Sequence, residues 1–290
     1  LDTLSVFLEF ENWQVFLNNS EQLKHDSSEK DTWEDLKKRT EKITNISLKS
    51  LKDKVGIRIQ NYPYRKFADK KFTNFLASSK IATAFVAPDC YGKTPIVIQL
   101  SEKFFTGPNA LCPNDILCLV DGSILFNLIT HDQKINRLYN LLNFDPQNSF
   151  SAFFRAHPER VKGKFVLIID GIDDIYQIDG KTVQFLDNLL KMVLSYKDIG
   201  WFKLLITCTP RIWRMLSGRI NLEPILKPFW YNVVFQETEN DFINIPLLRK
   251  KEIEKILKKN RFPYCADDLQ INYPDMLENI KNPYMLHLFM

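Results

Sequence analysis

The chain has little glycine, no long apolar run and no closely paired cysteines, and each shortage excludes a class of protein. Nine glycines stand beside 22 phenylalanines in 290 residues, which indicates a core-rich globular protein rather than a linker-rich one. No stretch approaches the roughly 18 consecutive apolar residues of a membrane-spanning helix. The first residues carry no basic stretch followed by an apolar block, so no signal peptide is expected. These shortages predict a cytoplasmic protein without a membrane partner.

Neither the spacing of the cysteines nor the net charge indicates a particular class of protein. None of the five cysteines forms a C-x-x-C pair, which favours reduced thiols over a disulfide or zinc framework. The 39 basic and 35 acidic residues leave a formal net charge of +4, too mild a balance to predict nucleic acid as a partner. The chain begins at Leu1 and stops inside an apolar helical pattern, and we expect it to be a fragment of a longer protein.

The pattern of apolar residues divides the chain into three parts. Residues 1–60 have helical spacing, interrupted near 26–28, and predict an N-terminal helical segment or linker. Over 61–245, strand-like runs alternate with helical segments, which predicts a three-layer α/β domain with a parallel sheet covered on both faces. Residues 246–290 predict a small helical domain. Strands are expected at 81–87, 116–120, 165–169, 204–207 and 231–235, and helices at 93–105, 124–142, 182–195 and 211–216.

The strand expected at 81–87 runs into a candidate phosphate-binding loop. Residues 87–94 read Ala-Pro-Asp-Cys-Tyr-Gly-Lys-Thr, which matches the end of the P-loop pattern G-x-x-x-x-G-K-[ST] and places Ala87 at its first position. Such a loop presents backbone N–H groups to phosphate at a helix N-terminus. Lys93 would reach the β- and γ-phosphates, and the Thr94 hydroxyl would bind Mg²⁺. The predicted nucleotide-contacting residues are Ala87, Cys90, Tyr91, Gly92, Lys93, Thr94 and Pro95.

A second segment argues against a chance Gly-Lys-Thr triplet. The apolar run 165–169 ends in Asp170, as expected for the strand that delivers the second group on the Mg²⁺ side of a P-loop site. Asp173 and Asp174 follow at the carboxyl end of that strand, where ligands bind in open α/β sheets. A solvated acidic turn is the simpler interpretation of 170–174 taken alone. With the loop upstream, we predict that Asp170 holds the metal and that Asp173 or Asp174 polarises the attacking water.

The strand expected at 204–207 ends in polar residues that suit a sensor of the γ-phosphate. Thr207 and Thr209 are the candidates, because this strand is expected to end at the same edge of the sheet. Arg211 is either a charge sensor or an ordinary surface residue in the first turn of a helix, and the sequence favours neither.

Together these segments resemble the NACHT-like branch of the STAND class of signalling ATPases. Residues 170–174, Asp-Gly-Ile-Asp-Asp, are similar to its D-G-x-D-E form of the Walker B motif, and 207–210 to its T-S-R-P sensor, with Thr209 at the arginine position. Residues 62–65, Tyr-Pro-Tyr-Arg, are similar to its Y-V-x-R segment, which implies that Arg65 lies beside adenine. Residues 282–286, Asn-Pro-Tyr-Met-Leu, resemble its N-P-L-x-L segment, which implies that Pro283 packs against the nucleotide.

The resemblance covers residues 60–290 and implies an ATP/ADP-gated switch of the kind used in immunity or defence. Such proteins rest closed with ADP, exchange it for ATP on a trigger, and then form homo-oligomers that activate an attached effector. The effector and sensor domains would lie outside residues 1–290. Ala87, Cys90 and Thr209 depart from the family pattern, so slow ATP hydrolysis is expected.

Two other functions stay open. The basic residues between Arg249 and Arg261 fit a mechanical or nucleic-acid-associated AAA-like ATPase, although a solvated helix face is the commoner meaning of such a run. A catalytically degenerate scaffold that binds nucleotide without turnover fits the altered loop.

Overall fold

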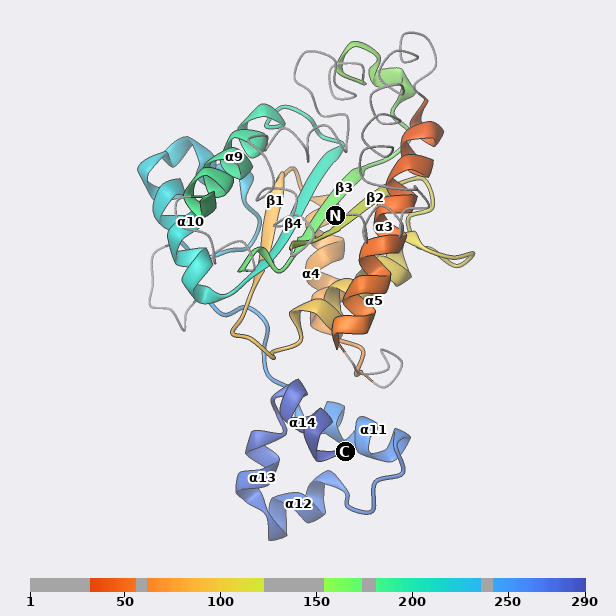
Figure 1. The fold of residues 1–290 in the computed structure, drawn as a ribbon, viewed down its shortest axis with the longest axis vertical. Helices are drawn as coiled ribbons and strands as arrows, with labels where there is room; N and C mark the ends of the chain where they lie inside the picture. Colours follow the sequence, from red (N-terminus) through yellow and green to blue (C-terminus); the bar gives the residue numbers. More distant parts are fainter. Residues whose placement is uncertain (1–31, 56–61, 123–153, 174–180, 236–241) are drawn as a thin grey trace, which may run out of the picture.

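A computed structural model describes residues 32–55, 62–122, 154–173, 181–235 and 242–290 of the chain. The helices expected within 1–28 and over 124–142 lie outside these ranges, as does Asp174. Within them, strands alternate with helices up to residue 222, and the chain ends in helices alone (Figure 1). The α/β class predicted from the sequence is confirmed.

The sheet has four parallel strands in the order β1-β4-β3-β2. The strands are β1 (Ala82–Val86), β2 (Ile116–Asp121), β3 (Phe165–Asp170) and β4 (Phe202–Cys208). Every strand residue is buried, as expected for strands covered on both faces. Four of the expected strands are thereby confirmed, with small shifts at their ends.

The strand expected at 231–235 is wrong. At the outer edge of β1 the described residues form one isolated parallel bridge, between Ala82 and Trp230, and further along Asn244 bonds to Ala84 O and to the Val86 N–H. Two side chains of the helix before it bind the backbone that a strand would need: Trp213 Nε1 donates to Val234 O at 2.7 Å, and Asn221 Nδ2 donates to Phe235 O at 3.0 Å. This competition explains why residues 231–235 do not pair along β1.

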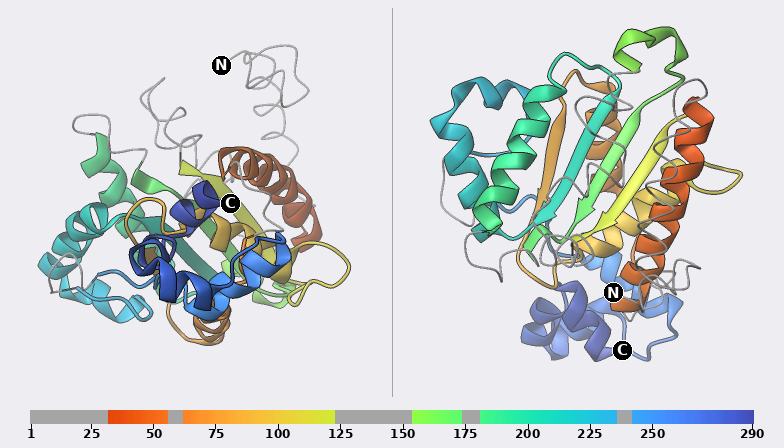
Figure 2. Two further views of the ribbon diagram at one scale, coloured as in Figure 1. Left: turned by 90° about the horizontal axis from the view of Figure 1, so that it is seen from below. Right: turned by 45° about the horizontal axis from the view of Figure 1, so that its top comes forward.

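Two layers of helices cover the sheet (Figures 1 and 2). One face carries α4 (Lys66–Ala77) and α5 (Lys93–Phe105), and the other carries α9 (Lys181–Ser195) and α10 (Pro210–Leu222). Short 3-10 turns occupy Pro158–Arg160 (η2) and Pro224–Phe229 (η4). Because successive strand residues point to opposite faces, each strand contributes to both apolar cores.

Helix α3 (Trp33–Val55) runs along β2, at the edge of the described sheet (Figure 1). Its Thr44 hydroxyl donates to Leu117 O at 2.9 Å and accepts from the Leu119 N–H at 3.1 Å. Trp33 Nε1 donates to Asn114 O at 2.8 Å. The helix therefore supplies hydrogen bonds that a neighbouring strand would otherwise make.

A small helical unit follows the sheet domain and lies beyond the carboxyl ends of the strands (Figure 2). It consists of α11 (Lys250–Lys259), α12 (Ala266–Asn272), α13 (Pro274–Asn279) and α14 (Pro283–Phe289). The unit has a core of its own, formed by Leu248, Ile253, Ile256, Leu257, Ala266, Leu269, Leu277, Ile280 and Leu286.

Candidate functional site

The carboxyl ends of β3 and β4 present polar side chains to the helix that follows β1. Val166 and Ile168 of β3 face the layer of α4 and α5, so the alternation of the strand turns Asp170 to the same side. Leu205 of β4 also faces that layer, and Thr207 follows it with the same parity. Since β4 lies between β1 and β3, both side chains come close to the first turn of α5.

The connections of the sheet also favour this place for a ligand. From β1 the chain crosses over α5 to β2, whereas from β4 it passes over α10 to the outer side of β1. The two adjacent strands β1 and β4 thus send their connections in opposite directions. Crevices at such switch points, outside the carboxyl ends of the strands, are where open α/β sheets bind ligands.

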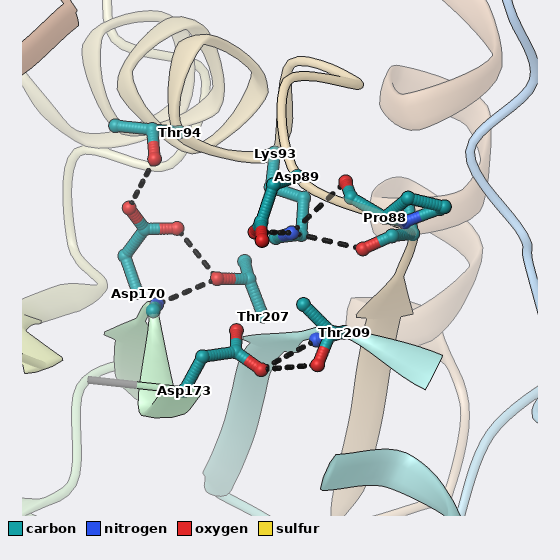
Figure 3. Close-up of polar contacts among 10 residues, drawn as sticks. Pro88, Asp89, Lys93, Thr94, Asp170, Asp173, Thr207 and Thr209 are labelled. Atoms are coloured by element: carbon teal, nitrogen blue, oxygen red, sulfur yellow. Dashed lines mark hydrogen bonds and ion pairs between the residues drawn. The ribbon is translucent and has the colours of Figure 1, made fainter. Parts of the chain in front are cut away.

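Asp170 is the centre of a hydrogen-bond network that joins three elements (Figure 3). The Thr94 hydroxyl donates to its Oδ2 atom and the Thr207 hydroxyl to its Oδ1 atom, both at 2.7 Å. Thr207 Oγ1 accepts from the Gly171 N–H, also at 2.7 Å. Burial raises the pKa of the Asp170 carboxyl, although the two hydroxyl donors favour the charged form. The structure therefore brings together the two residues predicted to bind metal, Thr94 and Asp170.

The loop 87–93 has the backbone shape of a tight phosphate loop. Cys90 has φ of 67° and Gly92 has φ of 85°, both in the left-handed region. A Cβ atom at Gly92 would lie 1.7 Å from Tyr62 Oη, so no other residue fits here without movement. The N–H groups of Gly92, Lys93 and Thr94 lie at the N-terminal end of helix α5. They donate no hydrogen bond to any described residue.

Lys93 folds back into this loop (Figure 3). Its Nζ atom donates to Ala87 O at 2.8 Å and to Pro88 O at 3.1 Å, and lies 3.4 Å from Asp89 Oδ1. The residue is only 9% exposed. The ammonium is thus already at the loop, and a phosphate would compete with these oxygen atoms for it.

Of the two aspartates predicted to polarise water, Asp173 is described and Asp174 is not. Asp173 Oδ1 accepts from both the N–H and the hydroxyl of Thr209, at 2.8 and 2.6 Å. Thr209 is the N-cap residue of α10, so this contact fixes the end of β3 against the start of that helix. Arg211 is exposed in the first turn of α10.

Arg65 contacts the start of the small helical unit, and Pro283 is part of that unit. The Arg65 side chain is 2% exposed; its Nη2 atom donates to Pro246 O, and its Nε atom lies 3.3 Å from Glu252 Oε1. Pro283 is buried at the first position of α14, and Asn282 caps that helix through the Tyr284 N–H at 2.9 Å. Pro283 thus has the ordinary role of a proline at the first position of a helix.

Sequence reasoning missed one acidic residue, Asp121, at the end of β2. It is 1% exposed and pairs in register with Asp170. Ser50 Oγ donates to its Oδ2 atom at 2.8 Å, and Lys54 Nζ lies 2.7 Å from its Oδ1 atom. The signal was present in the sequence, because the apolar run 116–120 ends in an aspartate just as 165–169 does.

A phosphate group with a divalent cation fits the donors and acceptors of this site. The unpaired N–H groups at the start of α5 and the Lys93 ammonium suit anionic oxygens. Thr94 Oγ1 and the Asp170 carboxylate suit Mg²⁺, which prefers oxygen ligands. Among the described residues, no three His, Cys, Asp or Glu side chains are placed to hold a metal by themselves. A cation here would therefore share its coordination with phosphate oxygens.

Comparison with known proteins adds no support to the family resemblance, which depends on the motif residues alone. No protein-family model matches the chain, and no curated protein sequence matches it. Within the described residues, no helix combines the length and apolar character needed to cross a membrane.

Proposed function

We propose that the chain binds ATP or ADP with Mg²⁺ at the loop 87–94 and acts as a nucleotide-gated signalling switch. The observation that carries the proposal is the hydrogen bonding of Thr94 and Thr207 to the buried Asp170. A hydroxyl from the turn after a phosphate loop and a carboxylate from a strand end are the two protein groups that P-loop proteins offer to Mg²⁺.

Each residue of the site has a stated task in the proposal. The N–H groups at the start of α5 and Lys93 bind the phosphates, and Thr94 and Asp170 hold the cation. Bound Mg²⁺ would neutralise charge on the β- and γ-phosphates. Thr207 orients Asp170 through its hydrogen bond and is the candidate sensor of the γ-phosphate.

Hydrolysis in this proposal is slow. Asp173 is held by Thr209 rather than pointing freely at a substrate water, and Thr209 stands where the resembled family has a sensor arginine. The task of polarising water then falls to Asp174 or to the remaining oxygen of Asp173. A scaffold that binds nucleotide without any turnover is the limiting case, and phosphate release distinguishes the two.

The switch part of the proposal follows the resemblance and the position of Arg65. This residue joins the segment before α4 to the start of the helical unit through Pro246 and Glu252. Nucleotide at the adjoining loop would thus be coupled to the helical unit. Homo-oligomerisation, effector activation and a cytoplasmic location belong to the same proposal.

The structure gives little support to the nucleic-acid alternative. Two of the lysines that suggested it have acidic partners, since Lys250 Nζ lies 2.5 Å from Asp267 Oδ1 and Lys258 Nζ lies 3.1 Å from Glu254 Oε1. The remaining basic residues of 249–261 are exposed on and beside α11, as in a solvated helix face.

Calorimetric titration with MgADP and MgATP tests the proposal. Lys93→Ala should weaken binding by about 2–4 kcal/mol, because it removes a charge-assisted contact in a buried loop. Lys251→Ala, an exposed lysine on α11, is the matched control and should bind as the wild type does. Equal affinity of wild type and Lys93→Ala would refute the assignment of the loop.

A further inference from the structure

The end of β2 places a second buried carboxylate beside Asp170. Asp121 and Asp170 are register partners on neighbouring parallel strands, whose backbones lie about 4.8 Å apart. Leu117 and Leu119 of β2 face the layer of α5, so alternation turns Asp121 to the same side as Asp170. The residues that follow the two strands are also close together. A Cβ atom added to Gly122 would lie only 2.1 Å from Gly171 O.

The last turns of α3 hold the Asp121 side chain. Ser50 Oγ donates to Oδ2 at 2.8 Å, and the Lys54 ammonium lies 2.7 Å from Oδ1. The same helix is fixed to β2 about two turns before these residues, through Thr44, which binds both Leu117 O and the Leu119 N–H. The position of α3 and the charge around Asp121 are therefore parts of one arrangement.

Electrostatics connects this arrangement to Asp170. Asp121 lies close enough to disfavour the ionised form of Asp170 and so adds to the rise in the pKa of that carboxyl. A negative charge at this distance attracts a cation placed on Asp170, and a lysine paired with that charge reduces the attraction. Lys54 on α3 thus opposes cation binding, whereas Asp121 favours it.

We infer that Asp121, Lys54 and Ser50 are positioning residues that couple the docking of α3 to cation affinity at Thr94 and Asp170. This inference rests on the proposed function, because it names how the cation of that site is regulated. Coupling of this kind is reciprocal. If the Lys54–Asp121 pair lowers cation affinity, a bound cation weakens that pair and loosens the last turn of α3. The state of the nucleotide site would thereby reach the helix that precedes the sheet domain.

The test measures cation affinity in variants that change one charge at a time. Mn²⁺ is titrated, by electron paramagnetic resonance, into protein saturated with ADP. Lys54→Met should bind Mn²⁺ about two- to tenfold more tightly than the wild type, since a unit positive charge several ångströms away is removed. Asp121→Asn should bind it more weakly by a similar factor. Lys54→Arg should restore the wild-type affinity.

Lys52→Met is the matched control. Lys52 lies on the same turn of α3 but pairs with Glu102 of α5 at 2.6 Å, so its removal should leave Mn²⁺ affinity unchanged. Amide exchange provides a second readout. Adding Mn²⁺ to the ADP complex, with EDTA as the reference, should speed exchange over residues 50–55 relative to the sheet in the wild type and in Lys52→Met, but not in Lys54→Met.

The outcomes separate this inference from the proposed function. Measurable Mn²⁺ binding that is equal in the wild type, Lys54→Met and Lys54→Arg overturns the coupling and leaves the proposed function standing. Absence of ADP and Mn²⁺ binding in the wild type overturns both. Lys54 is 43% exposed in its side chain, so its replacement keeps the test decisive even where Asp121→Asn fails to fold.

Discussion

The sheet domain and the small helical unit differ in how they are held together. The sheet is buried under apolar cores on both faces, and Asp121, Asp170 and Thr207 lie at the carboxyl ends of its strands. The helical unit has a single small core, and three of its four helices have only six or seven residues. Helices this short depend on tertiary packing for stability. The difference teaches that the candidate site lies on the region with the larger core, and that local unfolding is expected first in the helical unit.

The largest effect on this comparison is expected from the core of the sheet domain. Trp213 is fully buried, donates to Val234 O at 2.7 Å and packs edge-on against Trp230 at 5.2 Å. Trp213→Ala should lower the free energy of unfolding of the sheet domain by about 3–5 kcal/mol. Urea denaturation followed by circular dichroism measures this loss. Leu222→Ala, which is exposed at the end of the same helix, should leave the midpoint nearly unchanged.

A smaller, local effect is expected in the helical unit. Ile253 is fully buried in its core, and Ile253→Ala should cost about 2–3 kcal/mol, felt within that unit. Amide exchange should quicken over residues 250–289 while β1 to β4 keep their protection. A uniform loss of protection across both regions would show instead that they unfold as one cooperative body, and the contrast drawn above would be wrong.

The contact between the two regions is the next test. Glu252→Gln removes the charge that faces Arg65 Nε at 3.3 Å but keeps an amide oxygen that can accept from it, at a cost of about 1–2 kcal/mol because the guanidinium is buried. ADP should protect residues 275–290 in the wild type and protect them less in this variant, with nucleotide affinity little changed. Glu278→Gln is the control, because Glu278 forms a surface ion pair with Lys281 and does not contact Arg65. If ADP does not change the amide-exchange protection of residues 275–290 in the wild type, the helical unit is not part of the switch.

The smallest effect concerns Tyr62, which lies between the loop and Arg65. Its hydroxyl has no hydrogen-bond partner among the described residues, and burial raises the pKa of Tyr62 to about 12. The folded pKa is above the unfolded value of about 10, so the contribution to stability is present below pH 10 and is lost as the pH rises toward 12. Tyr62→Phe should be nearly neutral at pH 7 and should lose less stability than the wild type by pH 11. Parallel alkaline losses in both proteins would contradict this.

The sequence predicted the parts of the fold that follow from local patterns. Continuous apolar runs located the four strands, and the Gly-Lys-Thr triplet located the start of α5. The helix α4 was not anticipated, although Ala68, Phe72, Phe75 and Leu76 recur at helical spacing and form its buried face, so the signal was present in the sequence. The strand at 231–235 was overpredicted, since nothing local shows that Trp213 and Asn221 take its carbonyl groups.

The residues of the candidate site also fall into two groups, those that local sequence patterns predict and those that they do not. Thr94, Asp170 and Thr207 were predictable because each stands at a strand end or helix start, and parallel strands bring such ends to one edge. The contacts of Arg65 were not, because Pro246 and Glu252 lie about 180 positions away in the sequence. Asp121 was overlooked although its pattern matched that of Asp170; only its register with β3 and the approach of α3 give it meaning.

The pairing of Thr44 with β2 has a consequence for solubility. An edge strand with free N–H and C=O groups is a template on which another chain can add a strand, and proteins avoid this by covering the edge. Here one threonine of α3 occupies both a donor and an acceptor of that edge, at Leu119 and Leu117. A shortened chain that starts after residue 55 would lose this cover and leave an apolar edge exposed to its neighbours. We therefore expect a chain without α3 to aggregate more readily, since β2 is at the edge of the sheet in the described part of the chain.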